Sequence, residues 1–328
     1  MSKSTDAMSA LKTRPRDIIK MIILLLATIL ILYLVVRQIA GFDELGGAIQ
    51  AGRWEWSPLT GALLVGFLLL TGIRWRHIIQ TMGYQLPFGR TMSVIMASCP
   101  LAVITPSRVS DFLRALGIRD IVPLAEGSGS VLVYKFVDVQ SLCLLGIGGA
   151  LWVGLYEWAL WMTFALASGF AMLGLISKKR TFFLRLPLLN RFEDKLLKLF
   201  SAFGAMRERP WRYIGLSVLS IIAWSFGMLI FFSLTLVFDA DVSVANIFAL
   251  WPIAVFVGLL PVTLSGMGTR DSAFIALLGF TGGADFNEAA VLAATLTYAV
   301  TVLGIPAIVG IPFMFRFMHH LPKAHSTT

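Results

Sequence analysis

Two short stretches combine arginine and aspartate with helix-breaking residues, and each directly follows an apolar run. The first covers residues 105–114 and the second residues 261–271. Charged side chains and interrupted helices are both costly inside a bilayer, so each needs a reason to be there. Arginine offers a planar fork of donors that suits phosphate or carboxylate. The two stretches therefore predict the tips of two re-entrant hairpins that meet near the membrane centre, at a site for an anionic group.

The second stretch has the residues of a tight turn in front of a helix. Its proline ends the incoming helix, and its glycines permit positive φ. The free amides of the following helix would then face an anion beside Arg270. The candidate binding residues here are Ser265, Gly266, Gly268, Arg270 and Asp271. The alternative is that Arg270 pairs with Asp271 or another acid and only locks the hairpin.

The first stretch and the apolar run after it carry five more candidates. Arg108, Asp111 and Arg114 are spaced by three and can share one helix face, either at a buried site or on a short helix whose charges lie in water. Lys135 and Asp138 also have i,i+3 spacing, which predicts an ion pair between them. That pair either belongs to the site or fixes helix packing, and Lys135 can also extend toward the aqueous phase.

Composition places the chain among polytopic membrane proteins. Hydrophobic residues make up 57% and charged residues 14%, and the mean hydropathy is +0.82. A soluble domain would carry about a quarter charged residues, so a soluble enzyme is excluded.

The net charge of +9 is concentrated at residues 3–20 and 178–212, which fits the positive-inside rule better than nucleic-acid binding. Two cysteines and four histidines indicate neither a disulfide framework nor a metal site. Phosphate-loop, zinc and nucleophile-elbow motifs are missing, so we expect no cofactor.

Charge asymmetry predicts the topology. Arg74, Arg76 and Arg90 place the loop after residues 59–73 inside, as does the basic stretch 178–212. We expect an all-α polytopic protein with about six full spans and two oppositely oriented re-entrant hairpins. The order span, hairpin, span then occurs twice, as an inverted repeat whose broken segments mark the site. Its six segments are 59–73, 91–130, 131–153, 213–237, 245–284 and 289–315.

The domain organisation follows from these spans. Residues 18–316 form a single transmembrane domain between two cytoplasmic tails, 1–17 and 317–328. Within that domain, apolar residues at helical spacing predict an amphipathic segment at about 180–210 that lies on the cytoplasmic interface. We expect a multi-pass protein of the cell (inner) membrane.

Three ordered motifs resemble a known family. Residues 105–114, 133–138 and 261–271 are similar to the transmembrane, flippase-like region of lysylphosphatidylglycerol synthases and their stand-alone relatives. The third motif of the family usually ends Arg-Glu where this chain has Arg270-Asp271, and the second often has arginine where this chain has Lys135. In full-length synthases a C-terminal soluble domain performs aminoacyl transfer. Because this chain stops at Thr328, after the membrane part, the resemblance implies translocation of a lipid rather than that transfer.

The sequence therefore predicts a transporter, rather than an enzyme, for an anionic phospholipid or a polyprenyl-phosphate-linked lipid. Arg108, Arg114 and Arg270 would hold the phosphate, and Asp111, Asp138 and Asp271 would position the arginines or take up a coupling proton. Two rival functions stay open. One is a membrane-embedded transferase, and the other is a non-catalytic partner subunit of a cell-envelope synthase. A homo-oligomer is compatible with either, and nucleic acid is not an expected partner.

Overall fold

The computed structural model describes residues 26, 29–30, 32–39, 41–104, 111–178, 193–260, 263, 266–281 and 286–319. These residues form helices joined by short turns, and no strand occurs among them. Four helical stretches of the described residues are long and apolar enough to cross a membrane: 54–81, 124–152, 210–237 and 288–316. The prediction of an all-α polytopic membrane protein is confirmed. The predicted first span, 18–36, lies mostly outside the described residues.

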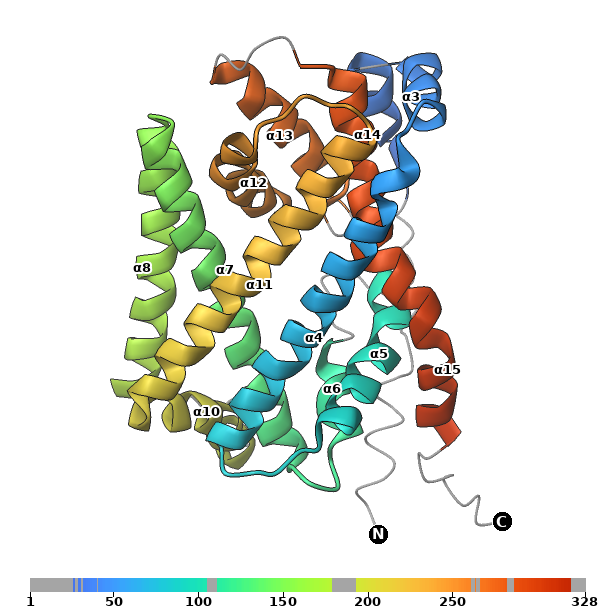
Figure 1. Ribbon diagram of the computed structural model, residues 1–328. Helices are drawn as coiled ribbons and strands as arrows, with labels where there is room; N and C mark the ends of the chain where they lie inside the picture. The colour runs from blue at the N-terminus through green and yellow to red at the C-terminus, as the bar shows by residue number, and fades with distance from the viewer. Residues whose placement is uncertain are drawn as a thin grey trace.

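The helices follow one another in a simple order (Figure 1). They are α3 (Gly41–Gln50), α4 (Ser57–Thr81), α5 (Phe88–Ile104), α6 (Leu113–Gly117), α7 (Leu124–Trp152), α8 (Tyr156–Lys178), α10 (Glu193–Glu208), α11 (Pro210–Val237), α12 (Val244–Gly258), α13 (Thr269–Phe280), α14 (Glu288–Ala299) and α15 (Ile305–His319), with a 3-10 turn, η1 (Trp54–Trp56), before α4. A π-helical turn, η5 (Val300–Gly304), joins α14 to α15, so the last long span contains a break in its regular hydrogen bonding.

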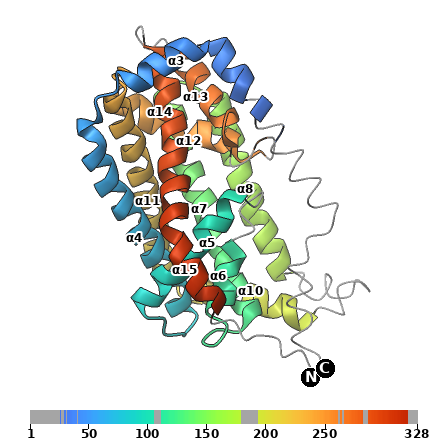
Figure 2. The same ribbon diagram turned by 90° about the vertical axis from the view of Figure 1, so that its right-hand side faces the viewer.

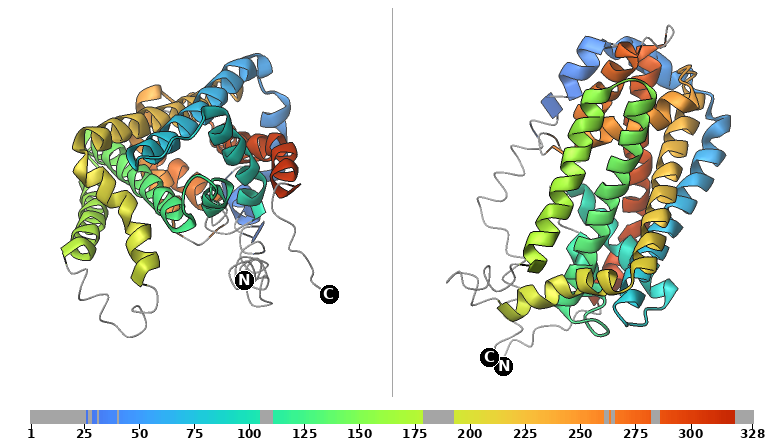
Figure 3. Two further views of the ribbon diagram at one scale, coloured as in Figure 1. Left: turned by 90° about the horizontal axis from the view of Figure 1, so that it is seen from below. Right: turned by 90° about the vertical axis from the view of Figure 1, so that its left-hand side faces the viewer.

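The bundle has two chemically different ends. At the lower end in Figure 1, α4 and α15 finish and α7 and α11 begin, and we call this the basic end. The arginines near these helix ends include Arg76, Arg90, Arg119, Arg207, Arg209, Arg212 and Arg316. At the opposite, acidic end, α3, the η1 turn and the start of α14 carry Asp43, Glu44, Glu55 and Glu288. The helix α10 lies across the basic end (Figure 3), where an amphipathic segment was expected.

Two helix pairs occupy opposite halves of the bundle. The pair α5–α6 lies in the half nearer the basic end, and the pair α12–α13 lies in the half nearer the acidic end (Figures 1 and 2). Each pair is flanked by long spans: α4 and α7 around the first, α11 and α14–α15 around the second. The predicted pattern of span, hairpin, span in two opposite orientations is therefore present in the fold.

The two halves interlock through their hairpins. The first helix of each pair packs against the last span of the other half: α5 against α15, and α12 against α7. Glycine makes both approaches close enough for backbone contact. A Cβ on Gly310 would lie 2.2 Å from the carbonyl oxygen of Met96, and one on Gly149 would lie 2.2 Å from that of Ala249. Small residues at such crossings let membrane helices approach closely.

Candidate functional site: two buried arginine clusters

The first cluster lies where the α5–α6 hairpin meets α4 and α7. It comprises Arg74, Asp111, Arg114, Lys135 and Asp138. Asp111 lies at the start of the segment leading into α6 and is 4% exposed. Its Oδ1 lies 2.8 Å from Nη2 of Arg114, which donates to it. This contact confirms that Asp111 and Arg114 share a helix face. Asp111 also pairs with the ammonium group of Lys135 on α7. One carboxylate thus joins the hairpin to the following span.

Arg74 on α4 is the member of this cluster that the sequence reasoning missed. It was assigned to a cytoplasmic loop, but it lies inside α4, about two turns before the helix ends, and is only 2% exposed. Its Nη2 donates to Oδ1 of Asp138 on α7 at 2.5 Å. The loop assignment is therefore wrong for Arg74. The available signal was that Arg74 directly follows the apolar run of α4, seven residues before the helix ends at Thr81.

The predicted pair between Lys135 and Asp138 is also corrected. Although the two residues are three apart on α7, Lys135 pairs with Asp111 of the hairpin and Asp138 pairs with Arg74 of α4. Contacts between different helices replace the local contact because both partners come from elements that pack against α7. The side chains of Lys135 and Asp138 are 31% and 20% exposed, so this side of the cluster is the accessible one.

An aromatic ring links the two arginines of the first cluster. The guanidinium carbon of Arg74 lies 4.5 Å from the centre of the Tyr134 ring, and that of Arg114 lies 5.6 Å from it. Such contacts stabilise a cation where water is scarce. The five charged side chains of the cluster are three cations and two anions. The described members of the first cluster therefore carry one net positive charge inside a membrane domain.

The second cluster lies where the α12–α13 hairpin meets α14, and it comprises Trp251, Arg270, Asp271, Thr295 and Tyr298. The turn before α13 uses Gly266 and Gly268 at φ values of 76° and 85°, so the prediction of a tight glycine turn is confirmed for both. Asp271 is fully buried and accepts the backbone N–H of Gly268 at 2.9 Å. The expected free amides at this helix start are thus partly occupied by the protein's own carboxylate.

Two donor atoms of Arg270, Nε and Nη2, are held by neighbouring groups. Both Nε and Nη2 donate to Oδ1 of Asp271, at 3.0 and 2.7 Å, and Nη2 also donates to the carbonyl of Thr295 at 3.3 Å. The guanidinium carbon lies 5.0 Å from the Trp251 ring centre and 5.1 Å from that of Tyr298. The pairing with Asp271 is the alternative that the sequence left open, in which this pair locks the hairpin.

The two clusters use equivalent positions of the fold. Tyr134 lies about three turns into α7, which follows the first hairpin, and Tyr298 lies about three turns into α14, which follows the second. Each tyrosine ring faces an arginine of its own cluster. Two candidate residues, Arg108 and Ser265, lie outside the described residues. The meeting of the two hairpin tips near the membrane centre therefore stays a prediction.

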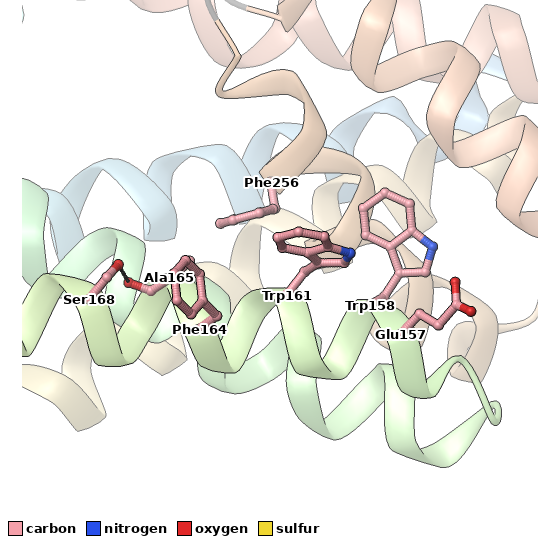
Figure 4. A pocket seen from close by; sticks show the side chains of 7 residues that line it. All are labelled: Glu157, Trp158, Trp161, Phe164, Ala165, Ser168 and Phe256. Atoms are coloured by element: carbon pink, nitrogen blue, oxygen red, sulfur yellow. Dashed lines mark hydrogen bonds between the residues drawn. The ribbon is translucent and has the colours of Figure 1, made fainter.

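A lateral groove lies between α8 and α12, and none of its lining residues belongs to either cluster. It has a volume of about 570 Å³ and is lined by Glu157, Trp158, Trp161, Phe164, Ala165, Ser168 and Phe256 (Figure 4). Volume alone would suit a ligand. However, its one charged lining group is the carboxylate of Glu157, which would repel a phosphate. The groove is therefore a poor candidate for the anion site.

Comparison with known proteins identifies the family. The model of the "Lysylphosphatidylglycerol synthase TM region" family matches residues 18–310. The chain belongs to this family. It is also 23% identical to the UPF0104 membrane protein MJ1595 of Methanocaldococcus jannaschii, over 93% of this chain and 97% of that protein. The resemblance noted from the three motifs is thereby confirmed.

The match to the lysylphosphatidylglycerol synthase transmembrane family covers both clusters. The matched region contains both hairpins and all five charged residues of the first cluster. Within the described residues, no group of three histidine, cysteine or acidic side chains could hold a metal ion.

Proposed function

We propose that this protein translocates an anionic lipid headgroup across the membrane and that the first cluster binds its phosphate. The observation that carries the proposal is the net positive charge of that cluster. An unbalanced charge in a low-dielectric interior is unfavourable until an opposite charge compensates it. A phosphate that reaches the cluster would supply the missing negative charge. Its acyl or polyprenyl chains would stay in the surrounding lipid.

Access to the first cluster favours entry from one side. Lys135 and Asp138 are its partly exposed members, whereas Arg114 is 8% exposed and Arg74 only 2%. A phosphate would meet Lys135 first and then the buried arginines. Since the first hairpin lies nearer the basic end, which the positive-inside rule makes cytoplasmic, we assign this entry to the cytoplasmic half.

The inverted arrangement supplies a route to the other leaflet. The fold places the α12–α13 hairpin in the opposite half, and each hairpin contacts the last span of the other half. Rigid-body rocking of such interlocked halves is the usual way in which inverted repeats alternate access. Arg270 and Asp271 would line the far half of this route, where a phosphate would have to compete with Asp271 for the arginine.

The test is headgroup translocation by the purified protein in liposomes. We would incorporate headgroup-labelled phosphatidylglycerol or a labelled polyprenyl phosphate and measure the protection of the label from an external quencher over time. Wild type should move at least one of these lipids, and Lys135→Gln should slow that movement about tenfold or more, because a charged hydrogen-bond donor is lost.

The matched control is Arg90→Gln. Arg90 lies near the basic end and pairs with Asp120 at 2.5 Å, but both side chains are largely exposed. Its loss should leave translocation within about twofold of wild type, because exposed pairs contribute little. Failure of folded wild-type protein to move either lipid would overturn the proposed function and favour the partner-subunit or transferase alternatives.

A further inference from the structure

The two sides of the Arg74 guanidinium are not used equally. Its Nη2 is engaged by Asp138, whereas its Nε is buried and has no hydrogen-bond partner among the described residues. These two N–H groups point in nearly the same direction and together form the fork that binds both oxygens of a carboxylate or phosphate. Asp138 therefore occupies only half of this fork. An unsatisfied buried donor is unfavourable and calls for an acceptor.

We propose that Arg74 is the residue that grips the lipid phosphate, through the Nε–Nη2 fork from which the phosphate displaces Asp138. This inference rests on the proposed function, because it names the residue that performs its binding step. Two oxygens of a phosphate would accept from both Nε and Nη2 of Arg74, whereas Asp138 accepts from Nη2 alone. Asp138 is 20% exposed, so its carboxylate has room to turn away from Arg74 when it is displaced. In the same movement, the phosphate replaces Asp138 as the negative charge beside Arg74.

The Tyr134 ring holds the arginine in place for this exchange. The ring faces the guanidinium of Arg74 at 4.5 Å. A cation–π contact of this kind is independent of Asp138 and would keep the fork oriented while the carboxylate leaves. The ligand class is a phosphate that carries at least one negative charge. Such a group is offered by the headgroup of a phospholipid and by free inorganic phosphate alike.

The experiment measures binding separately from transport. Purified full-length protein in detergent would be titrated with a short-chain phosphatidylglycerol, with a short-chain diacylglycerol that lacks phosphate, and with inorganic phosphate, while its intrinsic tryptophan fluorescence is recorded. Arg74→Lys should weaken phosphatidylglycerol binding about tenfold, because lysine keeps the charge but not the fork. Diacylglycerol should not bind, and inorganic phosphate should bind more weakly than the lipid.

Two further variants separate ligand contact from a structural role. Asp138→Asn removes the competing charge and should tighten phosphatidylglycerol binding several-fold, which loss of a purely structural pair would not do. Arg76→Lys is the matched control on the same helix, because Nε of Arg76 already donates to the carbonyl of Leu86 at 2.8 Å. Its phosphatidylglycerol affinity should stay within about twofold of wild type.

The outcomes distinguish this inference from the proposed function. Unchanged binding in Arg74→Lys, or weaker binding in Asp138→Asn, would overturn the role of Arg74 even if wild type moves lipid. Conversely, Arg74-dependent binding by a wild-type protein that moves no lipid would support the role of Arg74 and overturn translocation. Binding of inorganic phosphate as tight as that of the lipid would show a free-anion site and overturn the lipid assignment.

Discussion

Arg74 and Arg270 are similar residues in equivalent halves of the fold, yet they differ in what remains for a ligand. Both are buried, both pair with an aspartate and both face a tyrosine ring. Asp271 accepts both donors of the Arg270 fork, whereas Asp138 accepts one donor of the Arg74 fork. The second pair is neutral and the first cluster is net positive. We call the Arg270–Asp271 pair saturated because Asp271 accepts from both donors of the fork, and such a pair fixes structure. The Arg74–Asp138 pair uses one donor of the fork and leaves the other for a ligand.

The largest expected effect comes from breaking the saturated pair. Asp271→Ala would leave the guanidinium of Arg270 buried without a carboxylate and the N–H of Gly268 without its acceptor. We expect a loss of about 3–5 kcal/mol in the free energy of unfolding, measured by denaturant titration in micelles. Asp120→Ala breaks an exposed pair and should cost less than about 1 kcal/mol. Equal costs for the two variants would contradict the contrast between buried and exposed pairs.

The close helix crossings of the two hairpins should respond alike. A Cβ at Gly149 or Gly310 would meet a backbone carbonyl oxygen at 2.2 Å, so alanine at either position forces the helices apart. Each substitution should cost about 1–3 kcal/mol by the same denaturant titration. Gly148→Ala is the control, because nothing lies within 4 Å of its Cβ position. A large cost at one crossing alone would show that the two halves are not packed equivalently.

The smallest effect is expected when both charges of the Arg270–Asp271 pair are replaced, and this variant tests most directly whether Arg74 or Arg270 binds the phosphate. Replacing both charges of the second pair, by Arg270→Met with Asp271→Asn, removes the ions but keeps an acceptor for Gly268. Replacing a buried ion pair by uncharged groups of similar volume is often neutral. We expect unfolding free energies within about 1 kcal/mol of wild type, and a smaller loss of lipid translocation than in Arg74→Lys. Abolished translocation in this folded double variant would restore Arg270 as the main phosphate-binding residue.

Much of the fold follows from local properties of the sequence. Long apolar runs predict spans since every backbone group must be satisfied inside the bilayer. The paired broken segments and their charge pattern predict two oppositely oriented hairpins, and Gly266 and Gly268 predict the turn that the structure shows. The i,i+3 contact between Asp111 and Arg114 was also predictable, because it depends on helix geometry alone.

The sequence by itself thus determined the membrane class, the family, the two hairpins and the charged residues to examine. Only the tertiary structure decided which charges pair. Local spacing suggested a contact between Lys135 and Asp138. Helix packing instead pairs Lys135 with Asp111 and Asp138 with Arg74. Only the packing of α4 against α7 shows that Arg74 is a buried partner rather than a loop charge. The physical reason is that the desolvation and pairing of a charge depend on neighbours from distant parts of the chain, which spacing along one helix cannot reveal.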